Sequence, residues 1–347
     1  MRKKQGSAAP AAGKKPIALI LAGYDRLDAR TKRQKKKEML EAYDGEVIYM
    51  GHNKFLRNLA GRPIIQYVID AVFNARAEGA GSKKSSREPL YQTIHLYNDI
   101  ESFREEIDET MYPNLVLHQM TDSVGGHWKD FYFNHIEYGQ RVDVFFGDTP
   151  RITSADVEYI SGEFSKILGK AKDHRGVTVN MVYGIVEYED MKKDNWLAHR
   201  IKVIKRGANR GKLKSFVGFD GFQARVGNTG AMIKHPTIDP LIEYETLNFV
   251  YNLRKALSPS TFSRILYHLW RTKHFDMIRQ VKNRCIRETD YIEAVRDVIS
   301  KLYRIDIDQY GGILYHIKKN AARWENDIDS PLDYEVFKEK FGGMTER

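Results

Sequence analysis

Short apolar runs alternate with longer stretches of helical periodicity through the first half of the chain. The runs whose composition predicts buried strands cover residues 17–22, 91–97, 114–118 and 142–146. The stretches in which apolar residues recur at helical spacing cover residues 63–78, 100–110, 126–138 and 154–168. Such alternation predicts an α/β fold in which helices cover both faces of a parallel sheet.

The second half of the chain follows a different pattern. Residues 176–235 are richer in strand-like segments, whereas residues 241–320 turn helical and basic. The amphipathic runs there predict a helical insertion or a cap on one end of the sheet. A basic amphipathic surface over 255–300 also suits contact with an anionic membrane surface or with a second copy of the chain.

We divide the chain of 347 residues into four parts on these patterns, and its 42% hydrophobic content allows a sizeable core. The parts are a disordered basic tail over 1–15, an α/β core over 16–240, the helical insertion or cap over 241–320, and a return to the core over 321–347.

Composition narrows the functional class. The single cysteine, Cys285, cannot form an internal disulfide or a cysteine metal cluster. The first apolar run is too short for a secretory signal, so we expect a cytoplasmic enzyme. The net charge of +10 favours anionic partners, and the absence of any helix-turn-helix, zinc-finger or RNA-recognition pattern predicts no nucleic-acid partner.

One predicted strand ends abruptly on Gly147 and Asp148. In open α/β sheets ligands bind at the carboxyl ends of the strands, so we expect this carboxylate to lie in the ligand-binding or active site. Gly147, Asp148 and Pro150 equally suit an ordinary turn, and the motif gains weight only from other segments.

Two segments supply positive charge near the start of the fold. The first predicted strand runs into Gly23 and then into a basic stretch that contains Arg26. A glycine turn exposes backbone N–H groups, which suit a polyphosphate. Lys54 lies just before the turn that precedes the helix predicted at 63–78, and we place it near the same loop.

Two carboxylates lie near the end of the chain. Asp327 and Asp329 are two residues apart, so in an extended segment both can face one cation. A helix start at 330–331 explains the same residues without any function. Asp306 and Asp308 form a competing pair, which ranks lower because the Ser-Pro continuation is missing there.

In their order along the chain, these segments resemble the nucleotidyltransferase superfamily, which includes MobA-like NTP transferases, sugar-1-phosphate nucleotidyltransferases and cytidylyltransferases. The matching pieces are Leu21–Gly23, Lys54–Ile64, the loop after Gln119, Gly147–Thr153, Gly227–Gly230 and Asp327–Tyr334. The resemblance covers residues 16–235 and 320–341. It implies a mostly parallel, Rossmann-like (GT-A-like) sheet sandwiched by helices, with residues 176–235 on the acceptor side of a cleft.

The resemblance also implies an activity: transfer of an NMP from an NTP to a phosphorylated acceptor, with Mg²⁺ as cofactor and pyrophosphate as product. The catalytic residues it implies are Lys54, Asp148 and Arg26. The nucleotide-binding residues it implies are Leu21, Ala22, Gly23, Gln119, Gly125 and Gly126. The acceptor-binding residues it implies are Asn228, Thr229, Lys202 and Arg225. The metal ligands it implies are Asp148, Asp329 and Asp327.

Two alternatives come from other classes. A GT-A glycosyltransferase would use a nucleotide sugar, but it needs an Asp-x-Asp at the central strand end, where this chain has Gly147-Asp148-Thr149-Pro150. A non-catalytic regulatory protein would keep the fold and bind nucleotide. The loop residues Tyr24 and Asp25, which replace the usual second glycine, favour that alternative.

Overall fold

The structure is a computed structural model. It describes residues 14–22, 54–77, 88–121, 124–194, 196–200 and 217–234, together with most of 263–303 and 308–345.

Eight strands form one central sheet in the described part of the chain. They are β1 (Ile17–Leu21), β4 (Ile94–Asn98), β5 (Leu115–Gln119), β6 (Arg141–Phe146), β7 (Val179–Glu187), β8 (Val217–Gly218), β9 (Gln223–Ile233) and β10 (Gly311–His316). The order across the sheet is β10-β7-β9-β6-β1-β4-β5, and β8 pairs with β9. A separate two-stranded hairpin is formed by β2 (Asn58–Leu59) and β3 (Arg62–Pro63).

The sheet is mixed but mostly parallel, as the alternation of strands and helices predicts. Strand β1 pairs in parallel with β4 and β6, β4 with β5, and β7 with β10. Only β9 breaks the direction among the seven strands of that order, because it runs antiparallel to both β6 and β7. Strand β6 lies between β1 and β9. One of its neighbours therefore comes from the start of the chain and the other from its second half.

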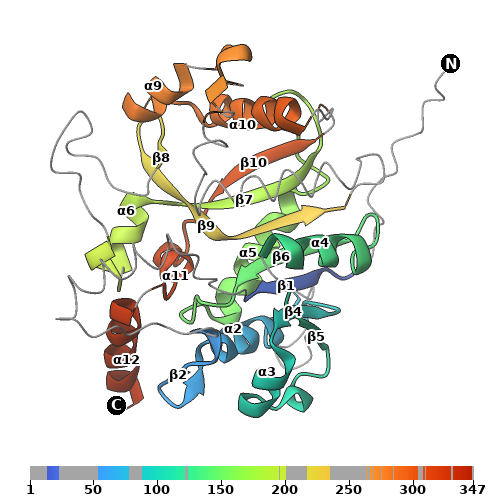
Figure 1. Cartoon of the computed structure of the whole chain (residues 1–347), viewed down its shortest axis with the longest axis vertical. Helices are drawn as coiled ribbons and strands as arrows, with labels where there is room; N and C mark the ends of the chain where they lie inside the picture. The colour runs from blue at the N-terminus through green and yellow to red at the C-terminus, as the bar shows by residue number, and fades with distance from the viewer. Residues whose placement is uncertain are drawn as a thin grey trace.

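Nine helices are described. They are α2 (Ile64–Phe73), α3 (Ile100–Glu106), α4 (Val124–Asn134), α5 (Ser154–Ile167), α6 (Tyr188–Met191), α9 (Asp276–Asn283), α10 (Glu288–Tyr303), α11 (Ala321–Glu325) and α12 (Pro331–Thr345). Short 3-10 turns include η1 (Lys54–Leu56) and η3 (Glu109–Met111). In Figure 1, α9 and α10 lie at the end of the molecule that holds β8 and β10, and α12 lies at the opposite end beside β2.

Alternation along β1 explains how the sheet is sandwiched. Ala18 and Ile20 pack in the core that holds α2 and α5. Ile17 and Leu19 point to the other face, where they pack with residues of α4 and α10. Because every residue of β1 is buried, the strand is apolar throughout, which is typical of a central parallel strand.

The predicted elements of the first half match the structure to within a few residues, and the predicted α/β class is confirmed. The sequence pattern predicts a helical segment over 241–320, and α9 and α10 agree with it. Gly311–His316 form strand β10 instead, which joins the main sheet beside β7. The helical prediction is wrong for these six residues because they pair in parallel with β7, a strand more than 120 residues earlier in the chain. Among the described helices, none has the length and apolar character needed to cross a membrane.

Candidate active site

Asp148 lies directly beyond the carboxyl end of β6, at the edge of the sheet where a ligand is expected. The Gly147 N–H donates to the Leu21 carbonyl at 3.0 Å, which holds the strand end against β1. A Cβ atom at Gly147 would lie 3.1 Å from the Ala22 Cβ and 3.2 Å from the Phe55 ring. A larger residue at this position would force the Ala22 or Phe55 side chain to shift by a few tenths of an ångström, so glycine suits the close approach of the chain to the end of β1 and to η1.

Lys54 connects the carboxylates of the site. It belongs to η1 and is buried, with 7% of its surface exposed. Its Nζ atom donates to Asp148 Oδ2 at 2.6 Å, to the Ile328 carbonyl at 2.9 Å and to Asp329 Oδ1 at 3.1 Å. A single ammonium group thus joins segments that are far apart in the sequence.

The segment between α11 and α12 carries the other two carboxylates. The Ile328 N–H donates to the Asp148 carbonyl at 2.9 Å, which docks the segment on the end of β6. Asp327 is buried, whereas Asp329 is exposed. The Asp329 N–H donates to Asp333 Oδ2 at 3.1 Å, so the first turn of α12 fixes the segment from its other side.

Charge and chemistry at this point fit a divalent cation. Asp148, Asp327 and Asp329 each offer a carboxylate oxygen, and these oxygens lie within 4.8 Å of one another. When all three are ionised, Lys54 balances only one of the three negative charges. Carboxylate oxygens are the ligands that Mg²⁺ and Ca²⁺ prefer, so an additional divalent ion would complete the charge balance.

The described acceptor-binding candidates lie on β9, next to β6, and their polar groups contact the protein itself. Asn228 Nδ2 donates to the Trp324 carbonyl at 3.0 Å, and Thr229 Oγ1 donates to the Val144 carbonyl at 3.0 Å. Arg225 forms an ion pair with buried Glu325, with Nε and Oε2 3.2 Å apart. These contacts tie β9 to β6 and α11. Lys202 lies outside the described residues.

The nucleotide-binding candidates are divided between two places. Leu21 and Ala22 are buried at the end of β1, adjacent to Gly147, while Gly23 and Arg26 lie outside the described residues. Gln119 ends β5, which is separated from β6 by β1 and β4.

Gln119 is also engaged by the protein, because its Oε1 accepts the Ile100 N–H at 3.2 Å. Gly125 and Gly126 belong to the first turn of α4. The sequence pattern places the start of that helix at 126, and the observed start is Val124.

Of the rival metal pair, Asp306 lies outside the described residues. The backbone carbonyl of Asp308 accepts a hydrogen bond from Arg175 at 3.2 Å.

Two polar features of the segments that carry the site were not predicted. Buried Asp333 accepts a hydrogen bond from His199 at 2.9 Å, although its sequence position indicates only a helix start. Arg151 follows the Gly-Asp-Thr-Pro turn, lies 3.9 Å from the centre of the Trp196 ring and pairs with Asp194. Burial lowers the pKa of Arg151. Its place three residues after Asp148 is the one sequence signal that could have identified it.

No family model and no curated protein matches this chain. Among solved structures, a hypothetical transferase structure from Thermus thermophilus is similar with a TM-score of 0.55 at 14% identity, covering 92% of this chain and 100% of that chain. This similarity confirms the predicted α/β fold.

Two looser matches have names from the superfamily that the sequence resembles. A CMP:2-keto-3-deoxy-manno-octonic acid synthetase complexed with CTP has a TM-score of 0.42 at 9% identity, covering 95% of this chain and 98% of that chain. A 4-diphosphocytidyl-2C-methyl-D-erythritol synthase from Anaerococcus prevotii has a TM-score of 0.44 at 11% identity, covering 97% and 100%.

Proposed function

We propose that this protein is a nucleotidyltransferase that moves an NMP from an NTP to a phosphorylated acceptor, such as a sugar phosphate, and releases pyrophosphate. The observation that carries the proposal is the cluster of Lys54, Asp148, Asp327 and Asp329 at the carboxyl end of β6. The cluster joins motifs that the sequence resemblance identifies independently of one another.

The order of strands supports binding of the nucleotide and of the acceptor on opposite sides of Asp148. Strand β1, which ends two residues before Gly23 in the sequence, lies on one side of β6, and β9 lies on the other. We assign the nucleotide to the β1 side, where the backbone from Leu21 to Gly23 would meet the base and phosphates. We assign the acceptor to the β9 side, where Arg225, Asn228 and Thr229 lie.

The remaining candidates keep the roles that the resemblance implies. Gln119, Gly125 and Gly126 complete the nucleotide side. Lys202 completes the acceptor side, and Arg26 joins Lys54 near the triphosphate. Asn228 and Thr229 already donate to backbone carbonyls, so we expect them to have a second role, in which Asn228 holds β9 to α11 and Thr229 holds β9 to β6.

Mg²⁺ is the cofactor that we propose, held by Asp148, Asp327 and Asp329. A bound Mg²⁺ would neutralise the charge of the phosphate oxygens. In the reaction, an acceptor phosphate oxygen forms a bond to the α-phosphorus of the NTP, and the bond to the bridging oxygen breaks with its electron pair on pyrophosphate. Such a displacement depends mainly on alignment and charge neutralisation.

Lys54 supplies fixed positive charge to this reaction. Its ammonium group is anchored by two carboxylates and one carbonyl, so it is oriented before any substrate arrives. A preorganised charge needs no reorganisation when negative charge moves onto the departing pyrophosphate. We therefore assign Lys54 to the triphosphate rather than to proton transfer.

The test is pyrophosphate release from each of the four NTPs with Mg²⁺, measured across a panel of sugar phosphates and polyol phosphates. Release that requires one NTP and one acceptor, and that is lost in Asp148→Asn but kept in Asp276→Asn, would establish the activity. Asp276 is a suitable control because its carboxylate is exposed and lies on α9. Sugar transfer from a nucleotide sugar without pyrophosphate would identify a glycosyltransferase, and nucleotide binding without turnover would identify a regulatory protein.

A further inference from the structure

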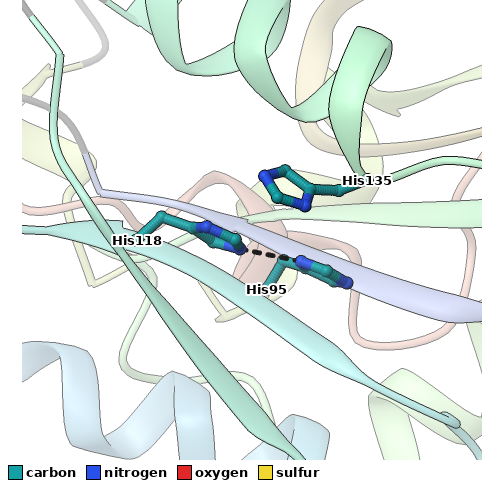
Figure 2. Close-up of side chains that lie close together, drawn as sticks. All are labelled: His95, His118 and His135. Carbon is teal, nitrogen blue, oxygen red and sulfur yellow. Dashed lines mark hydrogen bonds between the residues drawn. The ribbon is translucent and has the colours of Figure 1, made fainter.

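Three histidines converge on the face of the sheet that α4 covers. His95 lies on β4, His118 lies on the neighbouring strand β5, and His135 directly follows α4. Figure 2 shows His95 and His118 side by side, joined by a hydrogen bond, with His135 above them. These side chains are separate from the carboxylates of the candidate active site, which come from other elements.

The distances within this histidine cluster are those of potential ligands to one metal ion. His95 Nδ1 and His118 Nε2 are 2.9 Å apart, and one nitrogen from each of the three rings lies within 4.8 Å of the others. Two imidazoles on one tetrahedral Zn²⁺ have nitrogen atoms about 3.3–3.4 Å apart, since each Zn–N bond is about 2.0–2.1 Å. To bind one ion, the three rings would rotate so that the His95–His118 hydrogen bond opens and the three nitrogens point to a shared centre.

The donor atoms of the three side chains also select the kind of metal. Imidazole nitrogens suit Zn²⁺ and similar transition metals better than Mg²⁺, which prefers oxygen.

An acidic residue supports the cluster from outside. Asp130 Oδ2 lies 3.5 Å from His135 Nε2 and accepts a hydrogen bond from the Tyr97 hydroxyl at 2.6 Å. A carboxylate next to a ligating histidine orients the ring and makes it a better donor. Solvent reaches the site as well, because His135 is partly exposed.

We propose that His95, His118 and His135 form a binding site for a transition-metal ion, with Zn²⁺ as its preferred occupant and Asp130 as the carboxylate that orients His135. The ion ties β5, the last strand in the sheet order, to β4 and to the end of α4. This site has a structural role: it fastens the edge of the sheet, and the displacement reaction does not pass through it.

The test uses the full chain without a polyhistidine tag, stripped with a chelator and then titrated with Zn²⁺ or Co²⁺. The Asp148→Asn variant serves as a second background, so that binding at the acidic site does not obscure the result. We expect one Zn²⁺ per chain at this site in both backgrounds, a visible absorption band of tetrahedral Co²⁺, and a rise in the unfolding temperature when Zn²⁺ is added.

Substitution of the ligands should remove all three signals. We expect His118→Gln and His135→Gln to weaken Zn²⁺ binding by more than tenfold, since loss of an outer-shell partner alone costs about 10–100-fold. His174→Gln is the matched control, because His174 is also partly buried and bonds a carboxylate, Glu293, at 2.8 Å. Its Zn²⁺ affinity should equal that of the wild type.

Two results would overturn the proposal. One is a wild-type chain that binds no Zn²⁺ above the buffer level. The other is a His118→Gln or His135→Gln chain that keeps the wild-type affinity and the Co²⁺ spectrum. Since His135 lies beyond the end of α4 and is partly exposed, its variant is expected to fold, and far-ultraviolet circular dichroism would confirm that it does.

Discussion

The acidic site and the histidine cluster gather potential metal ligands in opposite ways. At the acidic site, charged groups from η1, from the end of β6 and from the segment before α12 meet, and a buried ammonium holds the carboxylates together. In the histidine cluster, three imidazole rings from β4, β5 and the end of α4 meet, and the carboxylate of Asp130 lies next to His135. The acidic site depends on a counter-ion for its stability, whereas the buried imidazoles of the histidine cluster make its stability depend on pH.

The largest effect should come from removing the counter-ion of the acidic site. Lys54→Met leaves Asp148 buried beside Asp329 without its positive partner, and breaking a buried ion pair from one side costs about 3–5 kcal/mol of unfolding free energy. Mg²⁺ should recover part of that loss, because it supplies the missing charge. Urea unfolding with and without Mg²⁺ measures both effects. Equal loss in the two conditions would show that no cation replaces the ammonium.

Asp148→Asn should lower the rate of pyrophosphate release without changing Zn²⁺ binding by the histidine cluster. Removing one preorganised charge-stabilising group from an active site typically lowers kcat by about 10²–10³-fold, and we expect a loss of that size in pyrophosphate release. Zn²⁺ binding should stay unchanged. Loss of Zn²⁺ binding in the same variant would show that the two regions are coupled.

Asp130→Asn should weaken the histidine cluster without removing a ligand. Asparagine can still accept the Tyr97 hydrogen bond, but it lacks the charge next to His135. We expect Zn²⁺ affinity to fall by about 10–100-fold, the usual cost of an outer-shell change. Competition with a colorimetric chelator measures this, and pyrophosphate release with Mg²⁺ should be the same as in the wild type. An unchanged Zn²⁺ affinity would remove Asp130 from the site.

Acidification should distinguish the two regions in the metal-free protein. Burial and the neighbouring imidazoles lower the pKa of His95 to about 3 and that of His118 to about 4, so the native chain keeps them neutral while the unfolded chain takes up protons below the ordinary value of 6.5. Their contribution to stability is therefore complete above pH 6.5 and is lost as the pH falls toward 4. We expect unfolding free energy to depend less on pH in His118→Gln than in the wild type over this range.

Other titratable groups face His95 and His118 and also affect this pH dependence. His135 faces both rings, and the carboxylate of Asp130 opposes the lowering at His118. Denaturant unfolding in buffers from pH 7 to pH 4, on wild type and variant in parallel, cancels the carboxylates that titrate elsewhere. Identical pH dependence in the two chains would show that the rings titrate as they do in the unfolded chain.

The sequence by itself determined the local elements and one part of the chemistry. Apolar spacing predicted β1, β4, β5 and β6 and the helices between them, because a strand or helix records in its own residues which of its faces is buried. The same logic placed Asp148 at the end of β6. It failed at β10, since a short apolar run that follows a long amphipathic helix does not itself indicate that it will pair with a distant strand.

Only the tertiary structure decided which polar groups meet. Lys54 reaches Asp148 and Asp329 because β6 lies beside β1 and because the segment before α12 docks on the end of β6. Neither contact can be predicted from the spacing of residues along the chain. The histidine cluster was not predicted at all, because His95 and His118 become neighbours only through the register of β4 on β5. Burial is a local pattern along an element, whereas convergence depends on strand order and register, which arise only when the whole sheet forms.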